Sequence, residues 1–141
     1  MKTFITTLFC FYTMIGLSQS VIGKWKTIDD ETGKEKAIVE IFEANGKIYG
    51  KIIEILEPEK KKLKCEKCEG SDKNKPILGL TIIKGLTKNG EVYDGNNIID
   101  PKNGKSYRCK MYLENKDKLI VRGYIGISFF GRSQVWHRFK S

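Results

Sequence analysis

The residues of this chain with the clearest chemical potential are a pair of cysteines, Cys65 and Cys68, in C-x-x-C spacing. Such a pair can form a structural disulfide, act as a redox dithiol or supply half of a metal site. A catalytic pair normally begins a helix that lowers the thiolate pKa, and no helical period follows here. A zinc site needs about four ligands, and Cys109 and His137 would have to be gathered by the fold. The spacing therefore favours a disulfide and leaves redox and metal chemistry as alternatives.

The remaining reactive side chains show no catalytic pattern. His137 is the only histidine, and it lies between Trp136 and Arg138 with no serine, cysteine or acid at an indicative spacing. Cys109 falls on an apolar strand face, which predicts a buried free thiol. We therefore assign no catalytic residue, no metal ligand and no cofactor, and the sequence argues against an enzyme.

Two groups of aromatic and basic residues are candidates for binding or for structure. Trp25 lies near the start of the chain, while Trp136 and Arg138 lie near its end; arginine stacking on tryptophan would suit the closed end of a barrel. A second set is predicted to face away from the main apolar faces, as a surface for a ligand: Phe42, Tyr49, Tyr112, Arg122 and Tyr124. With the opposite strand registers this second set would instead line a cavity.

The first twenty residues are typical of a secretory signal peptide. Lys2 precedes an apolar run that is too short to span a bilayer, and small residues follow at Ser18 to Ser20. We expect export to the periplasm or the medium, one domain over residues 21–141, and no transmembrane segment in that mature part. The formal net charge is +9. Because the lysines are interspersed with apolar residues and the chain is expected outside the cytoplasm, nucleic acid is not a predicted partner.

The elements that must position these residues are short strands. Asn45-Gly46 predicts a tight hairpin turn between residues 36–44 and 47–56, pairing Phe42 with Tyr49, Glu40 with Lys51 and Ile38 with Ile53. Val39, Ile41, Ile48 and Ile52 should then be core. Residues 57–76 are predicted to be a long exposed loop.

The second half of the chain continues the strand pattern. A hairpin around residues 115–117 puts Tyr107, Cys109, Met111 and Leu113 on one face, opposed by Leu119, Val121 and Ile125. Residues 128–131 should form a corner before the last strand. About eight consecutive antiparallel strands, with no sustained helical period, predict a single all-β, up-and-down barrel.

Several segments resemble one known family. They are residues 23–25, 32–34, 48–52, 65–68, 100–107, 119–124 and 131–138. On these segments the chain resembles the bacterial secreted family called domain of unknown function 2147. The resemblance implies a small antiparallel barrel similar to lipocalins, and it implies no established activity.

Three functional hypotheses remain. The favoured one is a non-enzymatic binding module for a small amphipathic or anionic ligand, or for a component of the cell envelope. The alternatives are a thiol- or metal-dependent activity at the Cys65–Cys68 loop and a structural envelope protein with a filled barrel. Only the interior of the barrel distinguishes the first hypothesis from the third.

Overall fold

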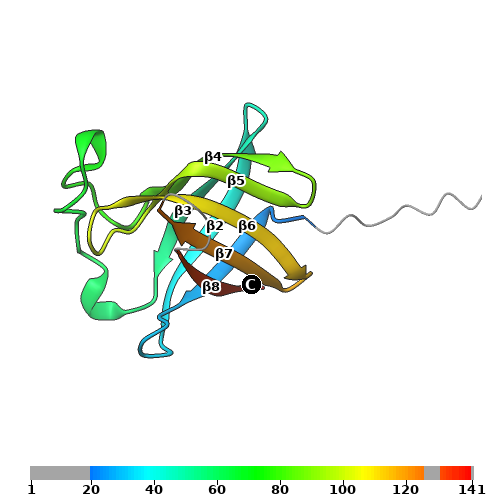
Figure 1. Cartoon of the computed structure of the whole chain (residues 1–141). Coiled ribbons are helices and arrows are strands. Elements are labelled where there is room, and N and C mark those ends of the chain that lie inside the picture. Colours follow the sequence, from blue (N-terminus) through cyan, green and yellow to red (C-terminus); the bar gives the residue numbers. More distant parts are fainter. Residues whose placement is uncertain (1–19, 126–130, 141) are drawn as a thin grey trace, which may run out of the picture.

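The computed structural model describes residues 20–125 and 131–140 of the chain, and these residues form a closed antiparallel barrel (Figure 1). Residues 1–19 of the expected signal peptide and residues 128–130 of the expected corner lie outside the described residues. Eight strands pair in chain order, each with the next, and β8 returns to β1. Their bounds are β1 Gly23–Ile28, β2 Glu35–Ala44, β3 Lys47–Ile55, β4 Thr81–Asn89, β5 Val92–Ile99, β6 Ser106–Asn115, β7 Lys118–Tyr124 and β8 Gly131–Arg138. The predicted up-and-down barrel is confirmed.

The β2–β3 hairpin largely follows the register that its turn predicts. Phe42 pairs with Tyr49 and Glu40 with Lys51, as expected from the Asn45-Gly46 turn. The predicted pairing of Ile38 with Ile53 is wrong, because a bulge between Ile38 and Val39 shifts the register and places Glu54 opposite Ile38. A bulge adds one residue to one strand and bends it, which suits a strand that must curve around a barrel.

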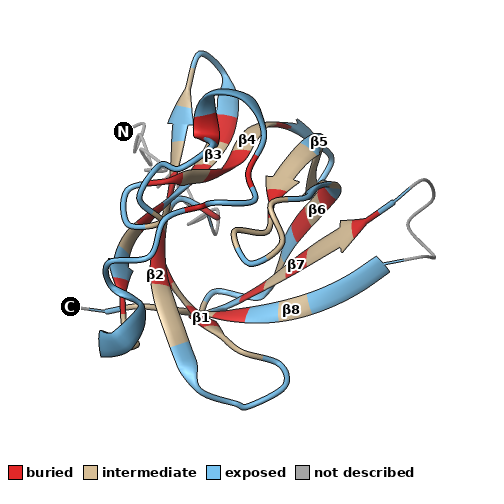
Figure 2. Cartoon of the chain, turned by 90° about the vertical axis from the view of Figure 1, so that its left-hand side faces the viewer, coloured by how far each residue is buried: buried red, intermediate tan, exposed pale blue. Residues whose placement is uncertain are grey.

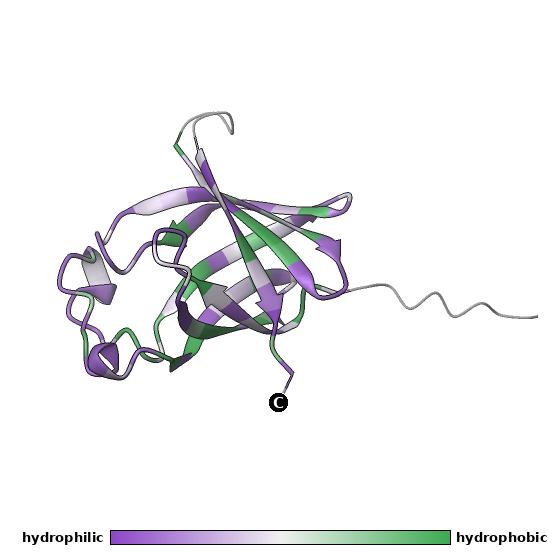
Figure 3. Ribbon diagram, turned by 90° about the horizontal axis from the view of Figure 1, so that it is seen from below, coloured by the Kyte–Doolittle hydropathy of each residue, from purple (hydrophilic) through white to green (hydrophobic). Residues whose placement is uncertain are grey.

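The barrel interior is formed by residues that alternate along each strand. Buried residues alternate with more exposed ones along the strands in Figure 2, and hydrophobic and hydrophilic residues alternate along the strands in Figure 3. The four predicted core residues of the first hairpin are all buried. Cys109 and Met111 are also buried on β6, opposite Gly123 and Val121 of β7. Ile125 was predicted to join them but is 67% exposed, because β7 ends at Tyr124.

The connections place the two ends of the barrel in different chemical settings. The "loop end" carries the β1–β2, β3–β4 and β5–β6 connections, and the "terminus end" carries residues 20–22, the β2–β3, β4–β5 and β6–β7 turns, and residues 139–140. The β3–β4 connection projects at the left of Figure 1, beside the β5–β6 turn. It contains two short 3₁₀ turns, η1 Pro58–Lys60 and η2 Gly70–Asp72. Among the described residues, no helix is long and apolar enough to cross a membrane.

Candidate functional site

The terminus end of the barrel is closed by Trp25 and Arg138. Trp25 is fully buried on β1, and its indole Nε1 donates to the carbonyl of Val21 at 2.9 Å. The Arg138 guanidinium carbon lies 4.3 Å from the centre of the Trp25 ring. The same guanidinium donates to the carbonyls of Ser20, at 2.8 Å, and Lys116, at 2.7 Å. The contact expected from the sequence is therefore present, and it ties the two termini to the β6–β7 turn.

The interior above this closed end is filled by side chains. Trp136 is 2% exposed and lies opposite Leu119, which is fully buried. Other inward side chains with no exposed surface come from two more strands, β4 and β6; they are Ile83, Leu86, Cys109 and Met111. A side chain with no accessible surface has no room for even a water molecule beside it. This half of the barrel is therefore a packed core.

Toward the loop end, the inward positions change from apolar to polar. Gln134 and Arg132 follow Trp136 at two-residue spacing along β8, so they share its inward face. Trp136 Nε1 donates to Gln134 Oε1 at 3.2 Å, and Arg132 forms an ion pair with Asp30 from the β1–β2 connection. The Asp30 carboxylate raises the pKa of Arg132 further, which keeps the guanidinium charged.

Two further inward residues lie at this end, one with a polar hydroxyl and one without a side chain. Tyr107 on β6 accepts a hydrogen bond from Asn103 Nδ2 to its hydroxyl at 3.1 Å. Gly123 on β7 carries no side chain, and the nearest atoms to a Cβ placed there belong to Ile98 and Tyr107, each at 3.7 Å. The rim of the barrel at the loop end thus presents the Arg132 cation, whose side chain is 62% exposed, beside an amide, a phenol and a glycine. We name Arg132, Gln134, Tyr107 and Gly123 the loop-end site.

The loop-end site is not among the ligand residues predicted from the sequence. The available signal was the alternation Arg132, Gln134, Trp136, because residues two apart on a strand share a face. The sequence predicts Tyr107 on the same strand face as Cys109 and Met111 and indicates no binding role for it.

The predicted ligand residues all lie on the outside of the barrel, in two separate groups. Phe42 and Tyr49 stack across the β2–β3 hairpin with ring centres 5.7 Å apart. Tyr112, Arg122 and Tyr124 lie on the outer face of β6 and β7, because Met111, Val121 and Leu119 between them point inward. The opposite registers, which would have put all five in a cavity, do not occur. Their role in binding stays a prediction.

Cys65 and Cys68 form a disulfide within the β3–β4 connection. The prediction that residues 57–76 are exposed throughout is wrong, because Cys65 has no exposed surface, Cys68 is 3% exposed and Asp72 is 7% exposed. The β5–β6 turn covers the disulfide. At Gly104, φ is +72° and a Cβ would lie 1.9 Å from the Lys67 carbonyl oxygen. The loop is therefore docked against the barrel by backbone contact.

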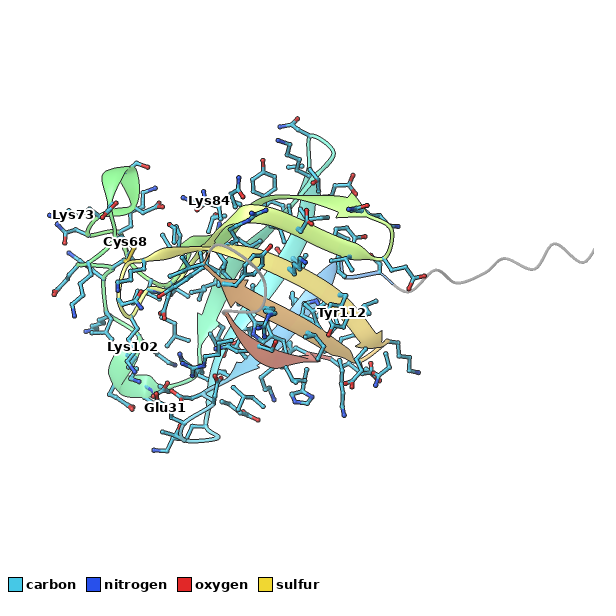
Figure 4. The ribbon with its side chains drawn as sticks, in the orientation of Figure 1. Glu31, Cys68, Lys73, Lys84, Lys102 and Tyr112 are labelled. Atoms are coloured by element: carbon cyan, nitrogen blue, oxygen red, sulfur yellow. A yellow bond between two sulfur atoms is a disulfide. The ribbon has the colours of Figure 1, made fainter. Side chains whose placement is uncertain are left out.

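A cavity of about 260 Å³ lies beside this docked loop. Asp72 is its only strongly buried charged residue among those described, and it accepts hydrogen bonds from Lys84 Nζ at 2.5 Å and Lys75 Nζ at 3.3 Å. The hydrogen bond from Lys84 holds the pKa of Asp72 below its usual value. Lys84 and Cys68 are labelled on this side of the molecule in Figure 4. Because the carboxylate is already paired, this cavity is polar but electrostatically satisfied.

The remaining candidates for metal or thiol chemistry lie apart. Cys109 is buried inside the barrel on β6, whereas His137 on β8 faces outward beside Lys118 and Lys26. Within residues 20–125 and 131–140, no group of three or more His, Cys, Asp or Glu side chains could hold a metal ion. Burial raises the pKa of the Cys109 thiol to about 12, which makes it a poor nucleophile.

Comparison with solved structures supports the same architecture. A Helicobacter pylori structure, titled "Protein HP1028 from the human pathogen Helicobacter pylori belongs to the lipocalin family", is 22% identical to this chain. The match covers 86% of this chain and 84% of that one, with a TM-score of 0.75. The barrel is thus lipocalin-like in fold.

Comparison with known sequences places the chain in a family. No curated protein matches it. A family profile described as "Uncharacterized protein conserved in bacteria (DUF2147)" matches residues 23–138, which include every strand of the barrel. The chain therefore belongs to this bacterial family, domain of unknown function 2147.

Proposed function

We propose that this protein is an exported, non-enzymatic binding module that holds a small amphipathic anion at the loop-end site. One observation carries the proposal: the inward residues change from a packed apolar core to Gln134 and Arg132 where the barrel approaches its loop end. The apolar part of a ligand would pack on Tyr107 and the surface of Gly123. Its anionic group would replace Asp30 as the ion-pair partner of the Arg132 guanidinium. Arginine suits this role because its donors match a carboxylate or phosphate geometry.

Export is part of the same proposal. The apolar segment within residues 1–20 supports it, as does the use of a disulfide to clip the β3–β4 connection. The ligand would then come from the periplasm, the envelope or the medium. N-terminal sequencing of the exported protein should find a first residue between Gln19 and Val21, and export of a chain that still begins at Met1 would contradict this.

A structural protein with a filled barrel is the second candidate, and the packed interior near the terminus end favours it. Native mass spectrometry of the protein purified from its own host discriminates the two. A co-purifying small molecule supports the binding module. A measured mass equal to that of the polypeptide alone, with no bound molecule, supports the structural role. Thiol chemistry has less support, because both sulfurs of the Cys65–Cys68 disulfide are buried.

A titration with anilinonaphthalene sulfonate, a fluorescent amphipathic anion, tests the loop-end site directly. Arg132→Gln should weaken its binding about tenfold, the value of one hydrogen bond to a charged group. Gly123→Leu should abolish binding by filling the space beside Ile98 and Tyr107. Lys88→Gln is the control, because Lys88 is an exposed cation near the terminus end of β4, at the end of the barrel opposite the loop-end site. Equal affinity for the parent, Arg132→Gln and Gly123→Leu would contradict the proposal.

A further inference from the structure

The excess positive charge of the chain is concentrated in its last third. Residues 105–140 contain nine lysines and arginines against two acids, Glu114 and Asp117. The β3–β4 connection looks more basic in the sequence, but its seven lysines over residues 57–76 are accompanied by five acids. The electrostatic asymmetry therefore belongs to β6, β7 and β8, which lie side by side in Figure 1.

An apolar row crosses the outer face of the same three strands. Tyr112 on β6 pairs with Ile120 on β7, which in turn pairs with Val135 on β8. Tyr112 and Val135 are each 41% exposed, so the row is open to solvent. Tyr112 is labelled on this side of the barrel in Figure 4.

Basic residues flank the row on both sides, about 7 Å away along each strand. On one side Lys110 pairs with Arg122, and Arg122 donates to Ser133 Oγ at 2.9 Å. Arg108 and Lys110 both lie over the Tyr124 ring. On the other side Lys118 pairs with His137. The acids on this face stand at its edges; they are Asp94, opposite Lys110, and Glu114, near the end of β6.

An open groove of about 620 Å³ continues this face at the terminus end. Its lining contains four basic residues and one acid among polar and aromatic side chains; the residues are Lys26, Asn115, Asp117, Lys118, His137, Arg138, Phe139 and Lys140. Asp117 lies 3.5 Å from Lys140 and 4.0 Å from Arg138, so this acid is shared by two cations. The groove therefore suits an anionic group of the size of a phosphate.

We propose that the outer face of β6–β8 docks on an anionic lipid bilayer, with the groove receiving a lipid headgroup. Charge complementarity accounts for the basic flanks, since the negative surface potential of an anionic membrane attracts each lysine and arginine close to it. A soluble polyanion would need the cations alone. A bilayer also takes up the apolar row, because tyrosine and aliphatic side chains are stable at the headgroup boundary and lysine stems can lie along it. This function is separate from ligand binding at the loop-end site.

Vesicle flotation tests the proposal with the chain from Ser20 onward, which contains all eight strands and lacks the apolar leader. The parent should float with phosphatidylcholine–phosphatidylglycerol vesicles and stay behind with phosphatidylcholine vesicles. The double variant Lys110→Glu with Lys118→Glu should lose at least about tenfold in affinity, since it reverses two charges on the face. The double variant Tyr112→Ser with Val135→Ser keeps every charge and should lose several-fold.

The matched control is Lys61→Glu with Lys62→Glu, two exposed lysines of the β3–β4 connection. This control makes the same change in net charge and should retain parent affinity within about twofold, because these lysines lie away from the face. Circular dichroism and thermal melting establish that each variant is folded. Equal losses in the control and the Lys110–Lys118 variant would overturn the proposal, as would full binding by the Tyr112–Val135 variant, which would assign the face to a soluble polyanion instead.

Discussion

The Arg138 guanidinium carbon lies 4.3 Å from the centre of the Trp25 ring, while the guanidinium donates to carbonyls of residues that precede β1 and follow β6. This one side chain joins three separate parts of the chain at the terminus end. Gly23 allows the approach, because its φ is +137° and a Cβ there would lie 2.9 Å from Arg138. The barrel closes where β8 pairs with β1, and the contact between Arg138 and Trp25 stabilises this junction.

Removing the tryptophan should therefore be costly. We expect Trp25→Ala to lower the free energy of unfolding by about 3–5 kcal/mol, as truncation of a large buried aromatic does. Arg138→Lys should lower the free energy of unfolding by about 1–2 kcal/mol. A lysine keeps the charge, but it cannot donate hydrogen bonds to the widely separated carbonyls at the same time. Denaturant melts measure both, with Arg108→Lys on the outer face as the control. A loss below about 1 kcal/mol for Trp25→Ala would argue against its role in closure.

Gly104 gives a sharp test of how the β3–β4 connection is held. Gly104→Ala introduces a side chain at φ +72° and also drives its Cβ into the Lys67 carbonyl. Gly90→Ala is the matched control, because Gly90 has φ +66° but nothing lies within 4 Å of its Cβ position. The control should cost about 1 kcal/mol from backbone conformation alone. Gly104→Ala should cost at least about 2 kcal/mol more and should expose the loop to proteolysis. Equal costs for the two variants would show that the turn and the loop are not docked.

Asp72 should make stability depend on pH in a defined direction. Its pKa is lowered in the folded state by Lys84, so the unfolded chain binds its proton more readily. The stabilisation is therefore complete above the unfolded pKa, about 4, and it is lost as the pH falls through the lower folded value. Asp72→Asn should lower the free energy of unfolding by about 1–2 kcal/mol at neutral pH, with the difference shrinking below about pH 4.

Lys84→Met provides the check on that assignment, because it removes the nearer of the two lysine partners and leaves the carboxylate. Its pH dependence should follow that of Asp72→Asn and not that of the parent. Denaturant melts over a series of acidic pH values give the comparison. A constant difference between parent and Asp72→Asn at every pH would mean that the ion pair contributes nothing to the linkage.

Cys109 should not react with thiol reagents while the protein is folded. The side chain has no exposed surface, and burial raises its pKa to about 12. In the chain from Ser20 onward, labelling by an aromatic disulfide reagent should follow the unfolding rate, and Cys109→Ala should abolish it. Because the folded pKa exceeds the unfolded value, any contribution of this thiol to stability is lost as the pH rises above about 8.5. Rapid labelling under native conditions would contradict the burial.

The residue pattern alone determined the fold class and much of the packing. Alternating apolar residues separated by turn signals such as Asn45-Gly46 specify antiparallel hairpins, and the pairing of Phe42 with Tyr49 follows directly from that turn. The tryptophan and arginine of the closed end could be named because they lie at opposite ends of a chain whose last strand must return to its first. These inferences are local, or they depend only on the topology of consecutive hairpins.

Tertiary structure decided the rest. The register shift between Ile38 and Val39 leaves Ile53 as an extra residue on β3, and the Asn45-Gly46 turn does not specify where along the hairpin such a bulge falls. Residues 57–76 read as an exposed loop because their composition is polar, yet Cys65 is buried by the β5–β6 turn that lies more than thirty residues away. The loop-end site and the basic outer face likewise depend on strand register across the sheet. Side chains distant in sequence acquire a common environment only when the strands pair, and that pairing is a property of the whole barrel.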